Sequence, residues 1–313
     1  MSFVDIITRL VLALADAAPL ALVTMGIVLI FRTSFTTNFA QGMISTSAAY
    51  ITTVFYNRFL MLNYPESNVF FGILISYFLG IGVGFLIGVF IDVVIIRNSK
   101  YSNSLTKQMI TMGVVLFLLG LLPTIFFKAD LNMPSIPKFF TGIIRIPLGD
   151  GNIVIQKNNL FSITLATVII VSVFIALKYT KWGLGVRATA SNEKVAGLMG
   201  VNTKRITAFS WGIAGALGSV GAILYAYNQS VSSFYMTEMQ VNGFLASILG
   251  GFSTFYGPII GAIIIPILNI SSYVLTDGTP LAVYYKIFVY VIILIIILIK
   301  PIGLFGKKIA KKV

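Results

Sequence analysis

Long runs of apolar residues alternate with short polar stretches along the whole chain. The runs are continuous, unlike the alternating strands of a membrane β-barrel, and a helix that crosses the bilayer needs about 20 such residues. The seventh run, residues 239–252, is short, which favours a broken or re-entrant segment. The pattern predicts an all-α, polytopic membrane bundle of about eight to ten transmembrane segments, forming a single membrane domain over residues 1–313. The nine segments that we predict are 6–31, 39–57, 69–96, 105–127, 160–177, 207–227, 239–252, 257–275 and 283–300.

A polar stretch, residues 33–42, separates the first two apolar runs. Asn38 and Gln41 are three positions apart, so they share a face if this stretch is helical. One interpretation is an ordinary short loop. The other is a loop that packs against the bundle and lines a pathway for a substrate.

Charged residues inside apolar runs are costly and are therefore candidates for function. Asp16 lies midway along the first run, and Arg9 lies seven residues earlier on nearly the same helix face. Asp16 belongs to a structural pair, lies at a shallow position near a helix break, or faces a transport path, where it would meet an ammonium group. Asp92 lies near the end of the third run, five residues before Arg97, and is expected to be a structural anchor.

Glycines recur at helical spacing within the runs, notably Gly80, Gly84 and Gly88, then Gly212, Gly215, Gly218 and Gly221, and also Gly257 and Gly261. Helices in lipid associate through close backbone approach at small residues. We predict tight helix packing at these positions. The alternative role is a set of hinges used in gating.

The region 128–159 differs from the apolar runs in its sequence pattern. Two β-prone runs, Ile143–Ile146 and Ile153–Gln156, flank a Gly-Asp-Gly turn, which predicts a small hairpin in an external loop. The hairpin is either a plain surface loop or a docking surface for an external partner.

Composition supports a membrane protein. The chain is 58% hydrophobic and only 10% charged, whereas a soluble domain has about 25% charged residues. The sequence has no Cys and no His, which excludes disulfides, Cys/His metal sites and a Ser-His-Asp triad. We therefore expect no metal site and no enzymatic activity in this chain.

The net charge of +13 is distributed unevenly. The segments 97–107 and 178–206 and the tail from Lys300 carry 14 of the 22 basic residues. Cytoplasmic loops are rich in Lys and Arg, so these segments are predicted to be cytoplasmic and the charge is not a nucleic-acid signal. If nine segments cross, the N-terminus is external.

The cytoplasmic loop 178–206 contains a predicted short amphipathic helix. Ser191 is the predicted cap, Val195, Leu198 and Met199 form an apolar stripe, and Gly200 ends the helix. This helix either lies on lipid or docks into a groove on a partner protein.

Four stretches of the chain, in order, carry a resemblance to a known family. They read LALVTMGIVLIFRTSFTTNFAQG, TKWGLGVRATASNEKVAGLMGVNTKRI, ILGGFSTFYGPIIGAIIIPILN and KPIGLFGKK. They resemble the permeases of Liv-type branched-chain amino acid ABC transporters. Asn38 to Gly42 favours the LivH-like branch, although Gln41 stands where that branch has His.

The resemblance implies a permease subunit of an ABC importer in the cytoplasmic (inner) membrane of a bacterium, moving branched-chain or other small amino acids. It implies coupling to cytoplasmic ATPase subunits through Arg187, Glu193, Ala196 and Gly200. It also implies a second permease subunit, an external substrate-binding protein, and contact with membrane lipid. ATP and Mg²⁺ would bind the ATPase, because this chain has no G-x-x-x-x-G-K-[ST] loop and needs no cofactor of its own.

The substrate path is expected to include Asp16, Asn38 and Gln41. Gln41, Asp16 and Pro19 depart from the family pattern near this path, so an amide or urea, a sugar or a nucleoside is an alternative substrate. An ion-coupled secondary transporter is the alternative mechanism, although Asp16 is its only mid-span acid. A channel is disfavoured because no TVGYG filter is present.

Overall fold

The structure of the chain is a computed structural model that describes residues 3–60, 69–100, 103–128, 135–148 and 151–306. Several residues of the sequence analysis lie outside this described part. They are the first two residues of the Gly-Asp-Gly turn, 149 and 150, and the tail from residue 307.

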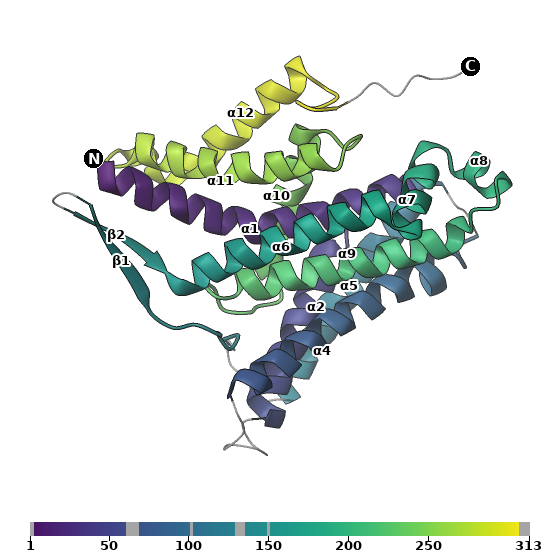
Figure 1. The fold of residues 1–313 in the computed structure, drawn as a ribbon, viewed down its shortest axis with the longest axis horizontal. Coiled ribbons are helices and arrows are strands. Elements are labelled where there is room, and N and C mark those ends of the chain that lie inside the picture. The colour runs from purple at the N-terminus through teal and green to yellow at the C-terminus, as the bar shows by residue number, and fades with distance from the viewer. Residues whose placement is uncertain (1–2, 61–68, 101–102, 129–134, 149–150, 307–313) are drawn as a thin grey trace.

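Helices dominate the described residues, as the sequence predicts (Figure 1). In chain order they begin with α1 (Phe3–Ser34), α2 (Gln41–Val54), the π-helix η1 (Phe55–Leu60), α4 (Val69–Phe90), the π-helix η2 (Ile91–Ile96) and α5 (Ser104–Lys128). After the strands β1 (Ile143–Leu148) and β2 (Gly151–Gln156) come α6 (Lys157–Tyr179), α7 (Lys181–Ser191), α8 (Glu193–Leu198) and α9 (Thr203–Tyr225). The chain continues through α10 (Tyr235–Gly250), α11 (Tyr256–Thr276), the 3₁₀-helix η3 (Pro280–Tyr284) and α12 (Tyr285–Ile299).

Seven helical segments within the described residues are long and apolar enough to cross a membrane. They match seven of the nine predicted segments. The other two predicted segments, 39–57 and 239–252, form α2 and α10, which have 14 and 16 residues. Nearly all of α2 is buried inside the protein, so its sequence does not need the apolar surface that lipid requires.

The centre of the bundle is formed by α1 and α9, which pack along each other. The helix α4 packs on α9 and α2, whereas α11 and α10 pack on α1 and on each other. Half of the largest fully buried side chains belong to α1, among them Leu22, Met25 and Ile27, and Trp211 of α9 is also fully buried. The core therefore follows the α1–α9 contact.

The predicted glycine packing is confirmed on α4. A Cβ atom at Gly80 would collide with Thr52 of α2, and one at Gly84 or Gly88 would collide with Ser219 or with the Trp211 carbonyl of α9. Gly82, on another face of α4, has no neighbouring atom in that position. The spacing of four residues thus marks the packed face of α4.

The predicted hairpin is also confirmed, with β1 and β2 pairing antiparallel and Ile146 opposite Ile153. The hairpin and the start of α1 lie at one end of the bundle, and α7 and α8 lie at the other (Figure 1). We call these the hairpin end and the α8 end.

Candidate functional site

The chain between α1 and α2 is not helical, and Thr36, Asn38 and Ala40 within it are fully buried. Gln41, the first residue of α2, donates from Nε2 to the carbonyl oxygen of Ala214, 2.8 Å away, near the middle of α9. Asn38 precedes α2, and its Nδ2 donates to Gln41 Oε1 at 3.2 Å. Both side chains are fully buried. The two amides therefore meet as expected, although Asn38 lies outside the helix.

Backbone groups exposed by this break have side-chain partners. The Ala40 N–H donates to Asn38 Oδ1 at 3.0 Å, and the Phe39 N–H donates to Thr111 Oγ1 of α5 at 3.2 Å. Non-helical backbone at membrane depth is tolerated only when its polar groups are satisfied within the protein. The polar composition of residues 33–42 thus has a local structural reason.

Gln240 of α10 completes this junction from the other side. Its Nε2 donates to the Phe39 carbonyl oxygen at 2.8 Å, and its Oε1 accepts from the Gly42 N–H at 2.5 Å. One amide therefore holds the start of α2 against α10. The sequence around Gln240 does not predict this contact, because nothing in its own helix distinguishes it from a surface glutamine.

At the α8 end, three short caps define the connection between α6 and α9. Thr180 Oγ1 accepts from Gly183 N–H at the start of α7, and Asn202 Oδ1 accepts from Arg205 N–H at the start of α9. For α8 the cap is Asn192, whose Oδ1 accepts from Val195 N–H at 3.1 Å. The predicted cap, Ser191, is instead the last residue of α7, because the unpredicted helix α7 extends up to it.

The C-terminus of α8 is a Schellman motif. The Gly200 N–H donates to the Gly197 carbonyl, and the Val201 N–H donates to the Ala196 carbonyl at 3.0 Å. Gly200 has φ +85°, a left-handed conformation that favours glycine. The predicted helix end at Gly200 is confirmed.

The apolar stripe of α8 has no cover in the described part of the chain. Leu198 is 87% exposed and Met199 is 80% exposed, whereas Ala196 on the opposite face is 5% exposed. Glu193, in the first turn, is exposed as well. The helix is therefore held from its Ala196 side and offers its apolar side outward.

Arg187 of α7 has a structural role in the fold. Its Nη1 donates to the carbonyl oxygens of Leu177 and Lys178, at 2.5 Å and 3.2 Å. These carbonyls belong to the last turn of α6, where a cation is favourable. Arg187 thus fixes the angle between α6 and α7, and through it the position of α8.

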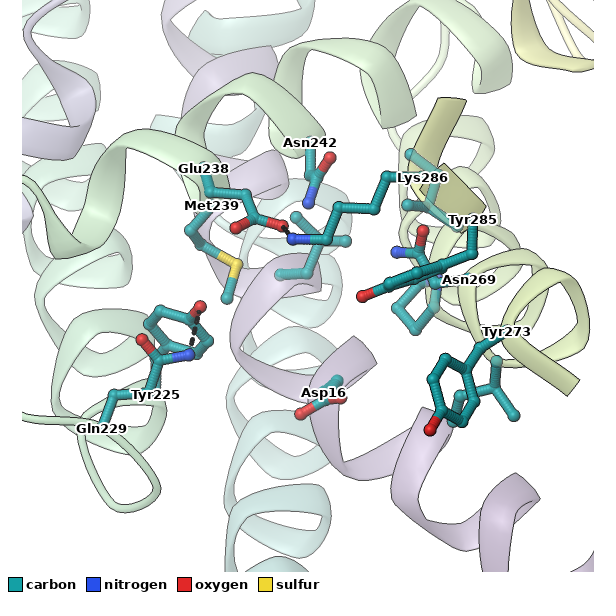
Figure 2. Close-up of a pocket in the computed structure, with 14 residues that line it drawn as sticks. Asp16, Tyr225, Gln229, Glu238, Met239, Asn242, Asn269, Tyr273, Tyr285 and Lys286 are labelled. Atoms are coloured by element: carbon teal, nitrogen blue, oxygen red, sulfur yellow. Dashed lines mark hydrogen bonds and ion pairs between the residues drawn. The ribbon is translucent and has the colours of Figure 1, made fainter. Parts of the chain in front are cut away.

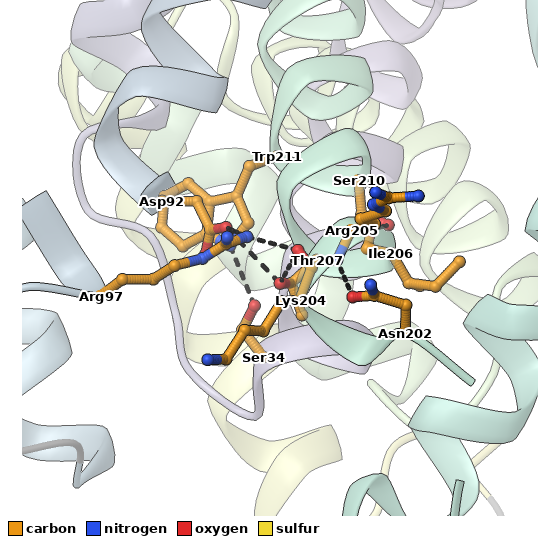
Figure 3. Close-up of polar contacts among 10 residues, drawn as sticks. All are labelled: Ser34, Asp92, Arg97, Asn202, Lys204, Arg205, Ile206, Thr207, Ser210 and Trp211. Atoms are coloured by element: carbon orange, nitrogen blue, oxygen red, sulfur yellow. Dashed lines mark hydrogen bonds and ion pairs between the residues drawn. The ribbon is translucent and has the colours of Figure 1, made fainter. Parts of the chain in front are cut away.

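A polar cluster connects the start of α9 to α4 and η2 (Figure 3). Arg97 Nη2 forms an ion pair with Asp92 Oδ2 at 2.7 Å and also donates to the Lys204 carbonyl oxygen. Thr207 Oγ1 lies 3.5 Å from the same Asp92 oxygen. Asp92 therefore acts as an anchor, as expected, and it ties the segment that follows α8 to the packed helix α4.

Asp16 lines a cavity of about 290 Å³ between α1, α9, α10, α11 and α12 (Figure 2). Across the cavity, Lys286 of α12 forms an ion pair with Glu238 of α10, with Nζ 2.5 Å from Oε1. Arg9 does not pair with Asp16 in the described structure; its guanidinium lies over the Tyr273 ring, 5.5 Å from the centroid. The sequence analysis found Asp16 but not the pair that faces it.

The predicted path residues are not brought together. Asn38 and Gln41 line the junction before α2, and they do not belong to the wall of the Asp16 cavity. Within the described residues, no group of three or more His, Cys, Asp or Glu side chains is placed to hold a metal ion. The roles of Asp16, Asn38 and Gln41 in a path stay predictions.

Comparisons with known proteins all find the same kind of protein, and the matches cover most of the chain. Residues 9–298 match the model of a family described as branched-chain amino acid transport system / permease component. A probable branched-chain amino acid transport permease protein LivH from Methanocaldococcus jannaschii is 26% identical over 92% of this chain and 88% of its own length. The high-affinity LivH permease protein of Escherichia coli is 23% identical over 94% and 93%, and BraD of Pseudomonas aeruginosa is 21% identical over 97% of each chain.

Proposed function

Since the chain belongs to the family of permease components of branched-chain amino acid transport systems, we propose that it is the transmembrane subunit of an ATP-driven importer. In this proposal the substrate is a branched-chain or another small amino acid. A separate ATPase supplies the energy, with ATP and Mg²⁺ bound there.

The observation that carries the proposal is the exposed apolar stripe of α8. Leu198 and the C-terminal cap Met199 are strongly exposed, and both ends of this helix are capped by the chain itself. A rigid apolar helix face without cover is typical of a helix that inserts into a groove of a partner. We assign that groove to the ATPase, with Arg187, Glu193, Ala196 and Gly200 shaping the contact.

The charge at the α8 end supports a cytoplasmic location for this contact. The basic residues of 178–206 belong to α7, α8 and the segments beside them, and Lys and Arg concentrate on the cytoplasmic side of membrane proteins. The hairpin end is then external, where β1 and β2 offer a docking surface to a substrate-binding protein.

A single substitution tests the ATPase contact. Leu198→Asp places a charge in the proposed groove, and the loss of a buried leucine costs about 1.5–3 kcal/mol, so affinity for the ATPase falls at least about tenfold. Co-purification of the permease with its ATPase from membranes, together with ATP-driven uptake, measures the effect.

Val283→Asp is the matched control, because Val283 is also strongly exposed but lies in η3 at the hairpin end. This control is expected to retain the ATPase. If Leu198→Asp co-purifies with the ATPase and supports uptake as well as the wild-type protein does, the assignment of α8 is contradicted.

The permease is proposed to act with a second permease subunit. Large apolar side chains cover the outward faces of α5, α6 and α12 in this single chain. Lipid and a second, similar subunit would share these faces. Movement of α8 would reach the bundle through the Arg97 cluster, which joins the start of α9 to α4.

Asp16 supports a second mechanism, ion-coupled secondary transport, because a carboxylate that lines a cavity within a transmembrane helix is typical of ion coupling. Uptake in vesicles distinguishes the two. Uptake that requires ATP and survives collapse of the ion gradients supports the importer, and the opposite result supports the secondary transporter. The same assay with amides, sugars and nucleosides tests the alternative substrates.

A further inference from the structure

The cavity that contains Asp16 has the size of a small-molecule site. Its volume of about 290 Å³ is close to the lower end of the roughly 300–1,000 Å³ that ligand pockets occupy. It lies between the middle of α1, the end of α9 and the start of α12. A ligand of a few heavy atoms fits it.

The charges around the cavity do not balance. Glu238 and Lys286 neutralise each other in an ion pair, which leaves the carboxylate of Asp16 as an additional negative charge (Figure 2). Among the described residues none donates a hydrogen bond to Asp16 or pairs with it. A carboxylate within a transmembrane helix is costly without a cation, so this side of the cavity favours a ligand group that is a positively charged donor.

Asn242 adds an amide to the wall of the same cavity. Its Nδ2 points toward the cavity and its Oδ1 points away from it (Figure 2). An amide N–H donates to an oxygen acceptor, so this group suits the carboxylate of a ligand.

The opposite charge of a zwitterion also has a partner. The Lys286 ammonium has three donors, and it gives one to Glu238. The remaining donors are available to a ligand carboxylate. Leu20, Ile265 and Ile270 add an aliphatic wall beside these polar groups.

We propose that this cavity is a binding site for an α-amino acid with an aliphatic side chain. The ligand ammonium binds Asp16, its carboxylate binds Lys286, and its side chain lies against Leu20, Ile265 and Ile270. The proposal rests on the proposed transport function, and it adds a site within the permease itself.

The absence of cysteine from the sequence allows a direct binding test on the assembled transporter. Asn269→Cys places a thiol in the cavity wall, and Asp277→Cys places one on an exposed residue after α11, outside the cavity. Saturating L-leucine, L-isoleucine or L-valine, each tested separately, is expected to slow modification of Asn269→Cys by a methanethiosulfonate reagent. The rate at Asp277→Cys is expected to stay the same. Equal rates at Asn269→Cys with and without each amino acid would overturn the proposal.

Charge variants of Asp16 test the ammonium contact. Asp16→Asn removes the charge that strengthens the hydrogen bond to the ligand ammonium. It is therefore expected to raise the amino acid concentration for half-maximal protection by about 10- to 100-fold. Asp16→Glu keeps the charge and is expected to restore most of the affinity. Asp277→Asn, outside the cavity, is the matched control. Protection of the Asp16→Asn chain at wild-type concentrations would overturn the role of Asp16.

Protection and transport are measured separately, so the two proposals fail in different ways. If the wild-type complex takes up none of the three amino acids with ATP, the proposed function is wrong. If it takes them up but none of them protects Asn269→Cys, the cavity proposal alone is wrong. If Asp16→Asn does not assemble with the ATPase, the cavity proposal is decided by the Asn269→Cys variant that retains Asp16. The measurement is whether the amino acids protect its thiol.

Discussion

Individual polar residues in this bundle serve backbone groups that the helices leave without partners. Asn38 and Gln240 satisfy backbone groups of the break before α2, and Arg187 satisfies the last carbonyls of α6. A polar side chain deep in a membrane bundle is therefore not by itself a substrate contact. Asp16 differs, because its carboxylate faces a cavity rather than the backbone.

At this scale we predict the effect of Gln240→Ala. The substitution leaves the Phe39 carbonyl and the Gly42 N–H without partners, and a buried unsatisfied polar group costs about 1–3 kcal/mol. The midpoint of thermal unfolding in detergent is expected to fall. Gln156→Ala, at an exposed strand end, is the control, and an equal midpoint for both variants would argue against the junction.

Helices pack in this protein according to which face carries the glycines. The three glycines of α4 spaced four apart meet α2 and α9, whereas Gly82 between them meets nothing. Sequence spacing identified this face, the hairpin and the end of α8, because each depends on local pattern. It did not identify α7 or the Asn192 cap, since Ser and Asn are equally good caps and sit side by side there.

The matched pair Gly84→Ala and Gly82→Ala tests the packing of α4. At Gly84 the added methyl group meets the Gly215 carbonyl oxygen at 3.0 Å and Ser219, so the helices must separate. Overpacking of this kind costs about 1–3 kcal/mol. At Gly82 the methyl group enters open space, where alanine is expected to be neutral or slightly stabilising. Thermal unfolding of the two purified variants measures the difference, and equal destabilisation would contradict the packed face.

The whole molecule is polarised, with the hairpin at one end and α8 at the other. The sequence gives this polarity through the distribution of Lys and Arg, but it does not reveal which distant side chains meet. Glu238 and Lys286 are 48 positions apart, and they pair only because α10 and α12 border one cavity. Such contacts depend on tertiary packing, which local patterns do not encode.

Sidedness follows from this polarity and is measurable in the cysteine-free chain. Leu198→Cys in α8 and Ile146→Cys in β1 both replace exposed side chains. A membrane-impermeant thiol reagent added to intact cells is expected to modify Ile146→Cys and to reach Leu198→Cys only after lysis. Modification of both in intact cells would contradict the assignment of the α8 end to the cytoplasm.

The position of Gln240 within α10 has one more consequence. Glu238, Met239 and Asn242 of the same helix line the cavity, while Gln240 between them grips the start of α2. A ligand that favours one position of α10 therefore also favours one position of α2. By thermodynamic reciprocity, any partner that displaces α2 changes the affinity of the cavity by the same factor. Through α10, binding of the ligand in the cavity and movement of α2 would therefore be coupled parts of one equilibrium.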